Sequence, residues 1–256
     1  MTSEITLASI QTFQPSADFL RDRNILVTGA ANGIGRAVAM ACASYGASVI
    51  LVDIDGKGLK SVYDTIESKG FPTPAMVPLD FQKASMESWE DLAEKLKDGF
   101  GILHGLIHCA ADVGILCPLD NYDLETWQRV MHVNFTSAYL LTRACLPLLR
   151  DSENGSIIFT TADVARQSKA YWGAYAVAGH AIEGLAQVWT RELSGERPVS
   201  VNTIDPGVVA TQLRQRIYPG EDPSTLRQPD DIAPLYTYVL EQSMKGEMTG
   251  ACLSAE

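Results

Sequence analysis

The sequence lacks an excess of positive charge. Lys and Arg together number 20 against 31 Asp and Glu, so the 256-residue chain has a formal net charge of −11. A protein that gains affinity for a nucleic-acid duplex by neutralising phosphates needs the opposite balance. We therefore expect no nucleic-acid partner, and we expect the acidic surface to be solvated.

The chain also lacks the marks of an exported or membrane protein. Its five cysteines are scattered without a C-x-x-C pair, which at this length argues against a disulfide framework. The N-terminus has no basic region of a signal peptide, and no apolar run reaches the roughly 18 residues of a membrane span. His104 and His108 have no third ligand nearby, so no metal site is predicted. These absences predict a cytoplasmic protein with free thiols and no membrane partner.

What the sequence does contain is a regular alternation of apolar runs and helical patterns. Because each crossover helix must pack over the sheet, this alternation indicates a parallel sheet covered on both faces. The sequence predicts an α/β fold: a single doubly wound Rossmann-type domain over 22–256, with a mostly parallel seven-stranded sheet, after a polar leader at 1–21. The strands are expected at 24–28, 48–52, 75–79, 103–109, 156–160, 200–204 and 250–254, and the helices at about 33–45, 57–69, 86–98, 124–150 and 173–193.

A charged, proline-containing segment at 216–230 interrupts this alternation after the sixth strand. A long irregular segment inside a compact domain is usually functional. We predict that 210–228 forms a lid over a substrate cavity, with Tyr218 and the more distant Trp172 at its mouth. The alternative is a plain surface excursion.

A glycine-rich turn follows the first strand. Ligands of doubly wound sheets lie beyond the carboxyl ends of the strands, which is where this turn falls. Gly29 permits a tight turn, Gly33 lets the backbone approach a pyrophosphate, and Gly35 lets the helix pack closely on the strand. The turn is therefore predicted to bind a dinucleotide through Thr28, Gly29, Asn32, Gly33, Ile34 and Gly35.

Asp53 ends the second strand, close to the roughly 20-residue interval after the glycines at which a carboxylate can accept hydrogen bonds from the adenine ribose. A carboxylate there would repel the 2′-phosphate of NADP. Neither Lys nor Arg interrupts 30–32, although Lys57 is near enough in sequence to soften the preference. Asp53 therefore favours NAD(H) over NADP(H), unless it is only a turn residue at the strand end.

With these features the sequence resembles the short-chain dehydrogenase/reductase family from about residue 22 to 253. The family's T-G-x-x-x-G-x-G is complete at 28–35, and its P-G-x-x-x-T segment is matched at 206–211. Its N-N-A-G segment is altered to His-Cys-Ala-Ala at 108–111. The resemblance implies that Asp80 contacts the adenine, that Asn134 orders a proton-relay water, and that the nicotinamide is held by Pro206, Gly207 and Thr211, with Ala110 at the floor of its site.

The family's chemistry uses a serine, a tyrosine and a lysine. The resemblance places the tyrosine at Tyr175, the serine at Ala162 and the lysine at Gly179, with Thr161 as a possible hydroxyl in place of the serine. A free phenol has a pKa of about 10, and lowering this to about 7 requires roughly 4 kcal/mol of stabilisation, to which Gly179 contributes nothing. Oxidation of an alcohol needs the phenolate, whereas reduction of a carbonyl can use the neutral phenol. We expect any activity to favour reduction.

Two functions remain open on the sequence. One is an NAD(P)-dependent oxidoreductase that transfers hydride to or from a small carbonyl or alcohol substrate with weak or rearranged catalysis by Tyr175, Asn134 and Thr161. The other is a nucleotide-binding homologue without turnover that acts as a regulator, scaffold or subunit partner. The resemblance further implies a homodimer or homotetramer, because the helices at 124–150 and 173–193 correspond to those that pair between subunits in the family.

Overall fold

The computed structural model describes residue 10, residue 13 and residues 15–255. Its sheet has seven strands, all paired in parallel, in the order β3-β2-β1-β4-β5-β6-β7. This confirms the predicted doubly wound α/β fold, and the reversal of strand order between β1 and β4 sets the place where such sheets bind ligands. The strands are β1 Asn24–Thr28, β2 Ser48–Asp53, β3 Ala75–Pro78, β4 Gly105–His108, β5 Gly155–Thr160, β6 Val199–Asp205 and β7 Cys252–Ser254.

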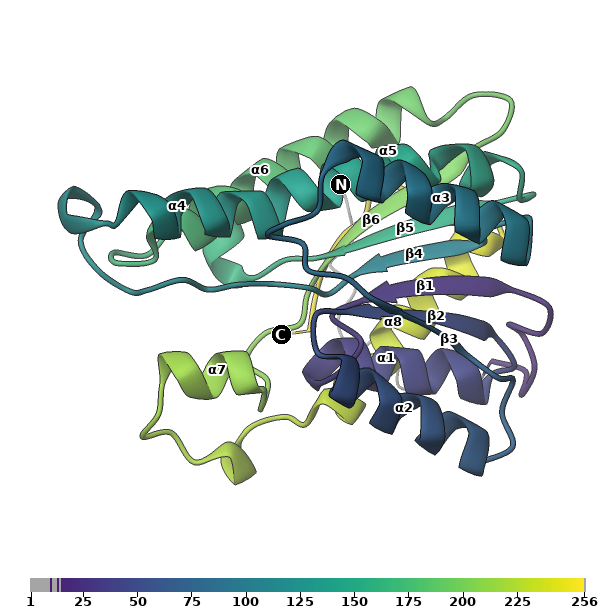
Figure 1. Cartoon of the computed structure of the whole chain (residues 1–256), viewed down its shortest axis with the longest axis horizontal. Helices are drawn as coiled ribbons and strands as arrows, with labels where there is room; N and C mark the ends of the chain where they lie inside the picture. The colour runs from purple at the N-terminus through teal and green to yellow at the C-terminus, as the bar shows by residue number, and fades with distance from the viewer. Residues whose placement is uncertain (1–9, 11–12, 14, 256) are drawn as a thin grey trace.

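Helices cover both faces of the sheet (Figure 1). The α-helices of the described residues are α1 Gly33–Ser44, α2 Gly56–Ser68, α3 Met86–Phe100, α4 Leu124–Met131, α5 Ser137–Arg150, α6 Gly173–Glu192, α7 Gln212–Ile217 and α8 Pro229–Met244. α1, α2 and α8 lie on one face, and α3, α5 and α6 lie on the other.

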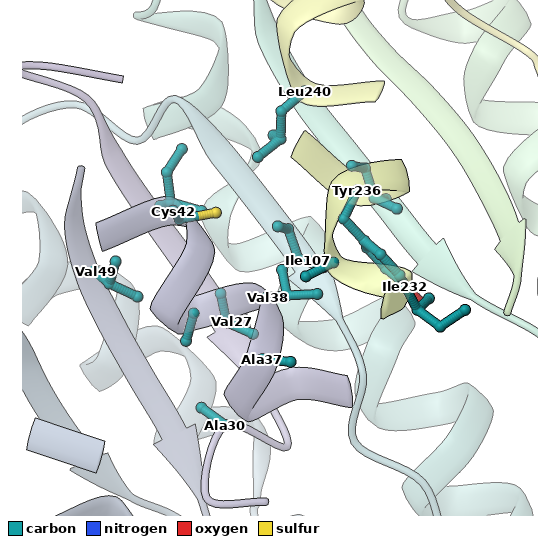
Figure 2. Close-up of a cluster of buried hydrophobic side chains, with 14 of the residues drawn as sticks. Val27, Ala30, Ala37, Val38, Cys42, Val49, Ile107, Ile232, Tyr236 and Leu240 are labelled. Carbon is teal, nitrogen blue, oxygen red and sulfur yellow. The ribbon is translucent and has the colours of Figure 1, made fainter. Parts of the chain in front are cut away.

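Alternate residues of each central strand point to opposite faces, which is why these strands are apolar throughout. On β1, Ile25 and Val27 belong to the core under α1 and α8, whereas Leu26 belongs to the core under α3, α5 and α6. Figure 2 shows the first of these cores, to which α1 contributes Val38 and α8 contributes Tyr236. The two cores hold the strand ends, and therefore the cavity described below, in a fixed arrangement.

The structure adds features that the sequence patterns did not predict, among them the short helix α7 within the predicted lid. The helix expected at 124–150 is divided by a π-helical turn, His132–Thr136, between α4 and α5. α8 was missed entirely, because Pro229 and Pro234 obscure a helical pattern that in fact begins at its first proline. Within the predicted leader, Leu20 is fully buried and Ile10 is buried too, so these residues complete the core beside α1 and α8.

Candidate active site

A cavity of about 730 Å³ opens at the carboxyl ends of the strands. Its walls come from the glycine-rich turn, from the ends of β2, β4, β5 and β6, and from α7. Thr28 and Asn134 do not line the cavity and lie behind its wall. The other predicted site residues all line it: Gly29, Asn32, Gly33, Ile34, Gly35, Asp53, Asp80, Ala110, Thr161, Tyr175, Pro206, Gly207 and Thr211.

The glycine-rich turn is shaped by close backbone approach. Gly29 has a φ of +66°, and a Cβ there would lie 2.8 Å from the backbone nitrogen of Ala110. A Cβ on Gly35 would lie 2.2 Å from the carbonyl oxygen of Gly29. α1 begins at Gly33, and the side chain of its N-cap Asn32 makes no capping hydrogen bond. Because the first N–H groups of a helix lack internal partners, this turn can hold an anionic pyrophosphate.

Thr28 organises the turn from behind. Its buried Oγ1 accepts hydrogen bonds from the backbone N–H groups of Cys109 and Ala110, at 3.1 Å each. These bonds join the end of β1 to the segment that follows β4. The hydroxyl therefore fixes the floor of the cavity without reaching into it.

Two carboxylates line the end of the cavity at which the adenosine is predicted to bind, which we call the adenosine end. Asp53 accepts hydrogen bonds from the backbone N–H of Ala31 through Oδ2 at 3.0 Å and from that of Asp55 through Oδ1 at 2.9 Å. Asp53 thus holds the glycine-rich turn as well as lining the cavity, and a carboxylate has further lone pairs that can accept ribose hydroxyls. Asp80 forms an ion pair with Lys83 at 3.0 Å.

Tyr175 lies at the other end of the cavity, on the first turn of α6. Its ring centroid is 5.8 Å from that of Trp172. Burial raises the pKa of the Tyr175 phenol to about 12, and the nearby carboxylates of Asp205 and Asp163 add to the rise. The phenol is therefore protonated at neutral pH and can donate a proton but not accept one.

One turn further along α6, the space beside Gly179 is already filled. A Cβ built on Gly179 would lie 2.6 Å from the Cβ of Ala165 and 3.2 Å from its Cα. Ala165 itself is buried, in a short 3₁₀ turn that follows β5. A lysine side chain therefore cannot leave Gly179 along its normal direction while Ala165 keeps this position.

Thr161 lines the cavity, but its hydroxyl is already committed. Its Oγ1 donates to Glu183 Oε1 at 2.9 Å. Glu183 also pairs with Arg166 at 3.0 Å and accepts from Thr203 Oγ1 at 2.9 Å. Thr161 could orient a carbonyl only if this hydrogen bond were given up.

Asn134 lies in the π-helical turn and clamps a cavity-wall residue. Its Oδ1 accepts from the backbone N–H of Asp112, and its Nδ2 donates to the Asp112 carbonyl, both at 2.7 Å. The Asp112 carboxylate in turn accepts from Arg129 Nε at 2.7 Å. Sequence reasoning missed Asp112 and Arg129. The one available signal was that Asp112 follows a strand at the ligand-binding edge of the sheet.

The predicted lid segment closes on itself. An isolated bridge between Val209 and Arg227 joins its two ends. Thr211 caps α7, accepting from the Arg214 backbone N–H at 3.1 Å, and Arg214 makes two hydrogen bonds to the Glu221 carboxylate at 2.6 and 2.8 Å. α7 and Tyr218 face the cavity. This arrangement suits a cover, although the covering role itself remains a prediction.

The family model described as short chain dehydrogenase matches residues 23–222. The chain belongs to the short-chain dehydrogenase family. Its relatives include the oxidoreductase YciK of Escherichia coli (strain K12), which is 39% identical over 244 residues, or 95% of this chain and 96% of YciK. This short-chain dehydrogenase is accordingly an oxidoreductase that uses a nicotinamide cofactor.

Solved structures extend the similarity to the whole fold. A short chain dehydrogenase from Shigella flexneri 2a str. 301, complexed with NADP, has a TM-score of 0.89 and 39% identity, covering 94% of this chain and 99% of that one. Another from Escherichia coli CFT073, complexed with NADPH, has a TM-score of 0.88 and 40% identity, covering 94% of this chain and 100% of that one. Across the described residues, no helix of this dehydrogenase is long and apolar enough to cross a membrane.

Proposed function

We propose that this dehydrogenase is a carbonyl reductase that uses Tyr175 as a neutral proton donor. When bound, the reduced nicotinamide supplies a hydride to the carbonyl carbon. The Tyr175 hydroxyl supplies the proton to the carbonyl oxygen, and solvent then restores the proton to the phenolate. The observation that carries the proposal is a protonated phenol in the cavity, whose pKa burial raises to about 12.

The direction of the reaction follows from the absence of a lysine ammonium beside Tyr175. In the family's pattern a lysine at position 179 would stabilise the phenolate, whereas here Ala165 fills that space. Oxidation needs Tyr175 as a base, and at pH 7 only about one phenol in 10⁵ is ionised when the pKa is about 12. Reduction needs only the protonated form.

The test measures both directions across a panel of carbonyls and the matching alcohols. We expect reduction to vary little from pH 6 to 9 and oxidation to rise about tenfold per pH unit, because only oxidation needs the phenolate. Tyr175→Phe should abolish reduction while leaving cofactor binding intact. A reduction rate unchanged by Tyr175→Phe would refute the proton-donor role.

For the cofactor we infer NADP(H), on the support of the relatives solved with NADP and NADPH. The expectation of NAD(H) rested on repulsion between Asp53 and the 2′-phosphate. The hydrogen bonds from Ala31 and Asp55 give that carboxylate a structural role that does not depend on the ribose. Calorimetric titration with NADPH and NADH decides between them, and tighter binding of NADH would restore the earlier expectation.

The second candidate function is a cofactor-binding homologue without turnover. It is favoured by Ala162 and Gly179, which stand where the family's serine and lysine are expected, and by the commitment of the Thr161 hydroxyl to Glu183. If the protein binds NADPH but does not oxidise it with any carbonyl of the panel, this function is favoured over reduction.

We further propose a homodimer or homotetramer in the cytoplasm. α6 exposes Val177 and Val188, and α5 exposes Tyr139, and the family resemblance assigns these two helices to subunit pairing. The five cysteines are free thiols, as a reducing compartment allows. Light scattering on the purified protein tests the first proposal, and cell fractionation tests the second.

A further inference from the structure

The end of the cavity that contains Tyr175, which we call the catalytic end, has more cationic side chains than we expect in an acidic chain. Besides Asp112 and Asp163, this end is lined by four cations from three segments: Arg129, Lys169, Arg214 and Arg216. In a chain with a formal net charge of −11, such a concentration of cations calls for a physical reason.

Three of these cations are each paired with a carboxylate. Arg129 pairs with Asp112 at 2.7 Å, Lys169 pairs with Asp163, and Arg214 pairs with Glu221 at 2.6 Å. Arg216 differs, because it has neither an ion pair nor a hydrogen bond with any described residue. Arg216, on α7, is therefore a cation of the cavity wall without an ion pair of its own, while the buried Asp205 carboxylate lies near Tyr175.

Arg129 also keeps unused donors. A guanidinium has five N–H donors, and Arg129 uses only Nε toward a described residue. The Arg129 side chain is held in place by two successive contacts. Asn134 holds the Asp112 backbone through two hydrogen bonds of 2.7 Å, and the Asp112 carboxylate holds Arg129. The terminal amino groups of Arg129 thus remain available on a fixed side chain, which is the arrangement that recognises a carboxylate through paired hydrogen bonds.

Arg216 lies within electrostatic range of Asp112, the carboxylate that holds Arg129. Burial opposes ionisation of Asp112, but hydrogen bonds from Arg129 and the Gly114 N–H, together with the charge of Arg216, hold the pKa of Asp112 below its usual range. α7 therefore brings Arg216 within electrostatic range of the Asp112–Arg129 pair, and both arginines line the same cavity.

Large apolar and aromatic side chains also line this end. Trp172, Leu213, Ile217 and Tyr218 lie on the cavity wall with Tyr175, and Thr161 and Gln212 add polar groups. Arg214 stacks over the Tyr218 ring, with its Cζ 3.9 Å from the centroid, so the wall is braced from the lid side. An apolar wall with a cationic end suits a short hydrocarbon chain that carries an acid group.

We propose that Arg216 and Arg129 bind a carboxylate of the substrate, so that the substrates are oxo acids whose carbonyl lies at Tyr175 and whose acid group lies at the two arginines. The inference rests on the proposed reductase function, because the bound acid is a substrate only if the protein reduces it. The anion site itself does not depend on turnover, and Asp112 and Asn134 are positioning residues for Arg129.

The test compares short straight-chain oxo acids with their corresponding amides, which have nearly the same shape without the charge. Calorimetry on the protein saturated with NADP measures binding, and NADPH oxidation measures reduction. We expect the acids to bind at least about tenfold more tightly than the amides. We also expect this preference to fall with rising salt, because a partly exposed charge pair is screened.

Variants locate the site. Arg216→Gln and Arg129→Gln should each remove most of the preference for the acid, whereas Arg191→Gln, an exposed arginine outside the cavity, should leave it unchanged. Asp112→Asn should weaken acid binding less than Arg129→Gln, because it loosens the arginine without deleting it. NADPH binding, measured in the same samples, shows that each variant is folded.

The outcomes separate the two proposals. Acid preference that Arg216→Gln removes, without any NADPH oxidation, would support the anion site and refute the reductase. Reduction of acids and amides with equal efficiency would support the reductase and overturn the anion site. Failure of both acid and amide to bind the NADP-saturated protein at millimolar concentration would also overturn the anion site.

Discussion

The two ends of the cavity are held together in different ways. At the dinucleotide end the contacts are made by backbone: Gly29 against Ala110, Gly35 against Gly29, and the Thr28 hydroxyl on two N–H groups. At the catalytic end the contacts are made by side chains: Thr161 with Glu183, and Asp112 with Arg129. Backbone geometry tolerates almost no change in residue type, whereas a side-chain network can be rewired. The difference teaches why one end follows the family pattern closely and the other does not.

The sharpest way to break this comparison is Gly35→Ala. The new Cβ would lie 2.2 Å from a backbone oxygen that cannot move alone. We expect at least about a 100-fold loss of NADPH affinity and a destabilisation of about 1–3 kcal/mol. Calorimetric titration and urea unfolding measure the two effects. Gly184→Ala is the matched control, because a Cβ there meets nothing within 4 Å, and a Gly35→Ala protein that bound NADPH normally would contradict the assignment.

The second test rebuilds the catalytic end. Ala162→Ser with Gly179→Lys should gain little and should lose about 1–3 kcal/mol of stability, because the lysine Cβ meets Ala165. Adding Ala165→Gly should remove the 2.6 Å contact, leave the 3.2 Å approach to the Cα of residue 165, and raise alcohol oxidation at pH 7 by roughly 100-fold over the starting protein.

Rates of oxidation and thermal unfolding, measured for the double and triple variants together, provide the check. If the double variant were as stable and as active as the triple variant, Ala165 would not be what closes the lysine site.

The third test concerns His108, which ends β4 beneath the catalytic end. It is buried, hydrogen-bonded to Thr142 at 2.9 Å and stacked on Phe159, and burial lowers its pKa to about 3. The unfolded chain takes up a proton near pH 6.5 whereas the folded protein does not, so the stability is present above pH 6.5 and is lost as the pH falls toward 3.

At pH 5 the expected loss is about 2 kcal/mol, from the roughly 1.4 kcal/mol per pH unit that one such group contributes. His108→Gln keeps a polar partner for Thr142 and should flatten the dependence by about this slope. Urea unfolding at several pH values between 7.5 and 5 measures it. Parallel pH profiles for the two proteins would show that His108 is not the group responsible.

The smallest expected effect comes from a substitution of Asp53, at the adenosine end. Asp53→Asn removes a charge and keeps the shape, so the ratio of NADPH to NADH affinity should rise by roughly tenfold. The glycine-rich turn should also loosen, because the N–H groups of Ala31 and Asp55 lose a charged acceptor and the asparagine has only one oxygen to serve the two. An unchanged ratio would mean that Asp53 serves only the turn.

The sequence places the glycine-rich turn and Asp53 on the cavity wall because the signals for them are local. The glycines follow β1 directly, and Asp53 ends the next strand, so fold and position can be read from neighbouring residues. The closure of Gly179 by Ala165 could not be predicted, because it depends on a 3₁₀ turn in another segment. The pairing of Asp112 with Arg129, and the approach of Arg216 from α7, depend on tertiary packing that no spacing encodes. α8 was missed for the opposite reason: its prolines are local signals that usually mark irregular chain.

The contact between Ala165 and Gly179 also constrains the order in which substitutions can occur. From the present chain, lysine at position 179 is unfavourable until position 165 has first lost its methyl group. The first of the two substitutions, at position 165, therefore adds no catalytic group by itself. The methyl group of Ala165 thus couples position 165 to position 179, so that a lysine at 179 needs a change at both.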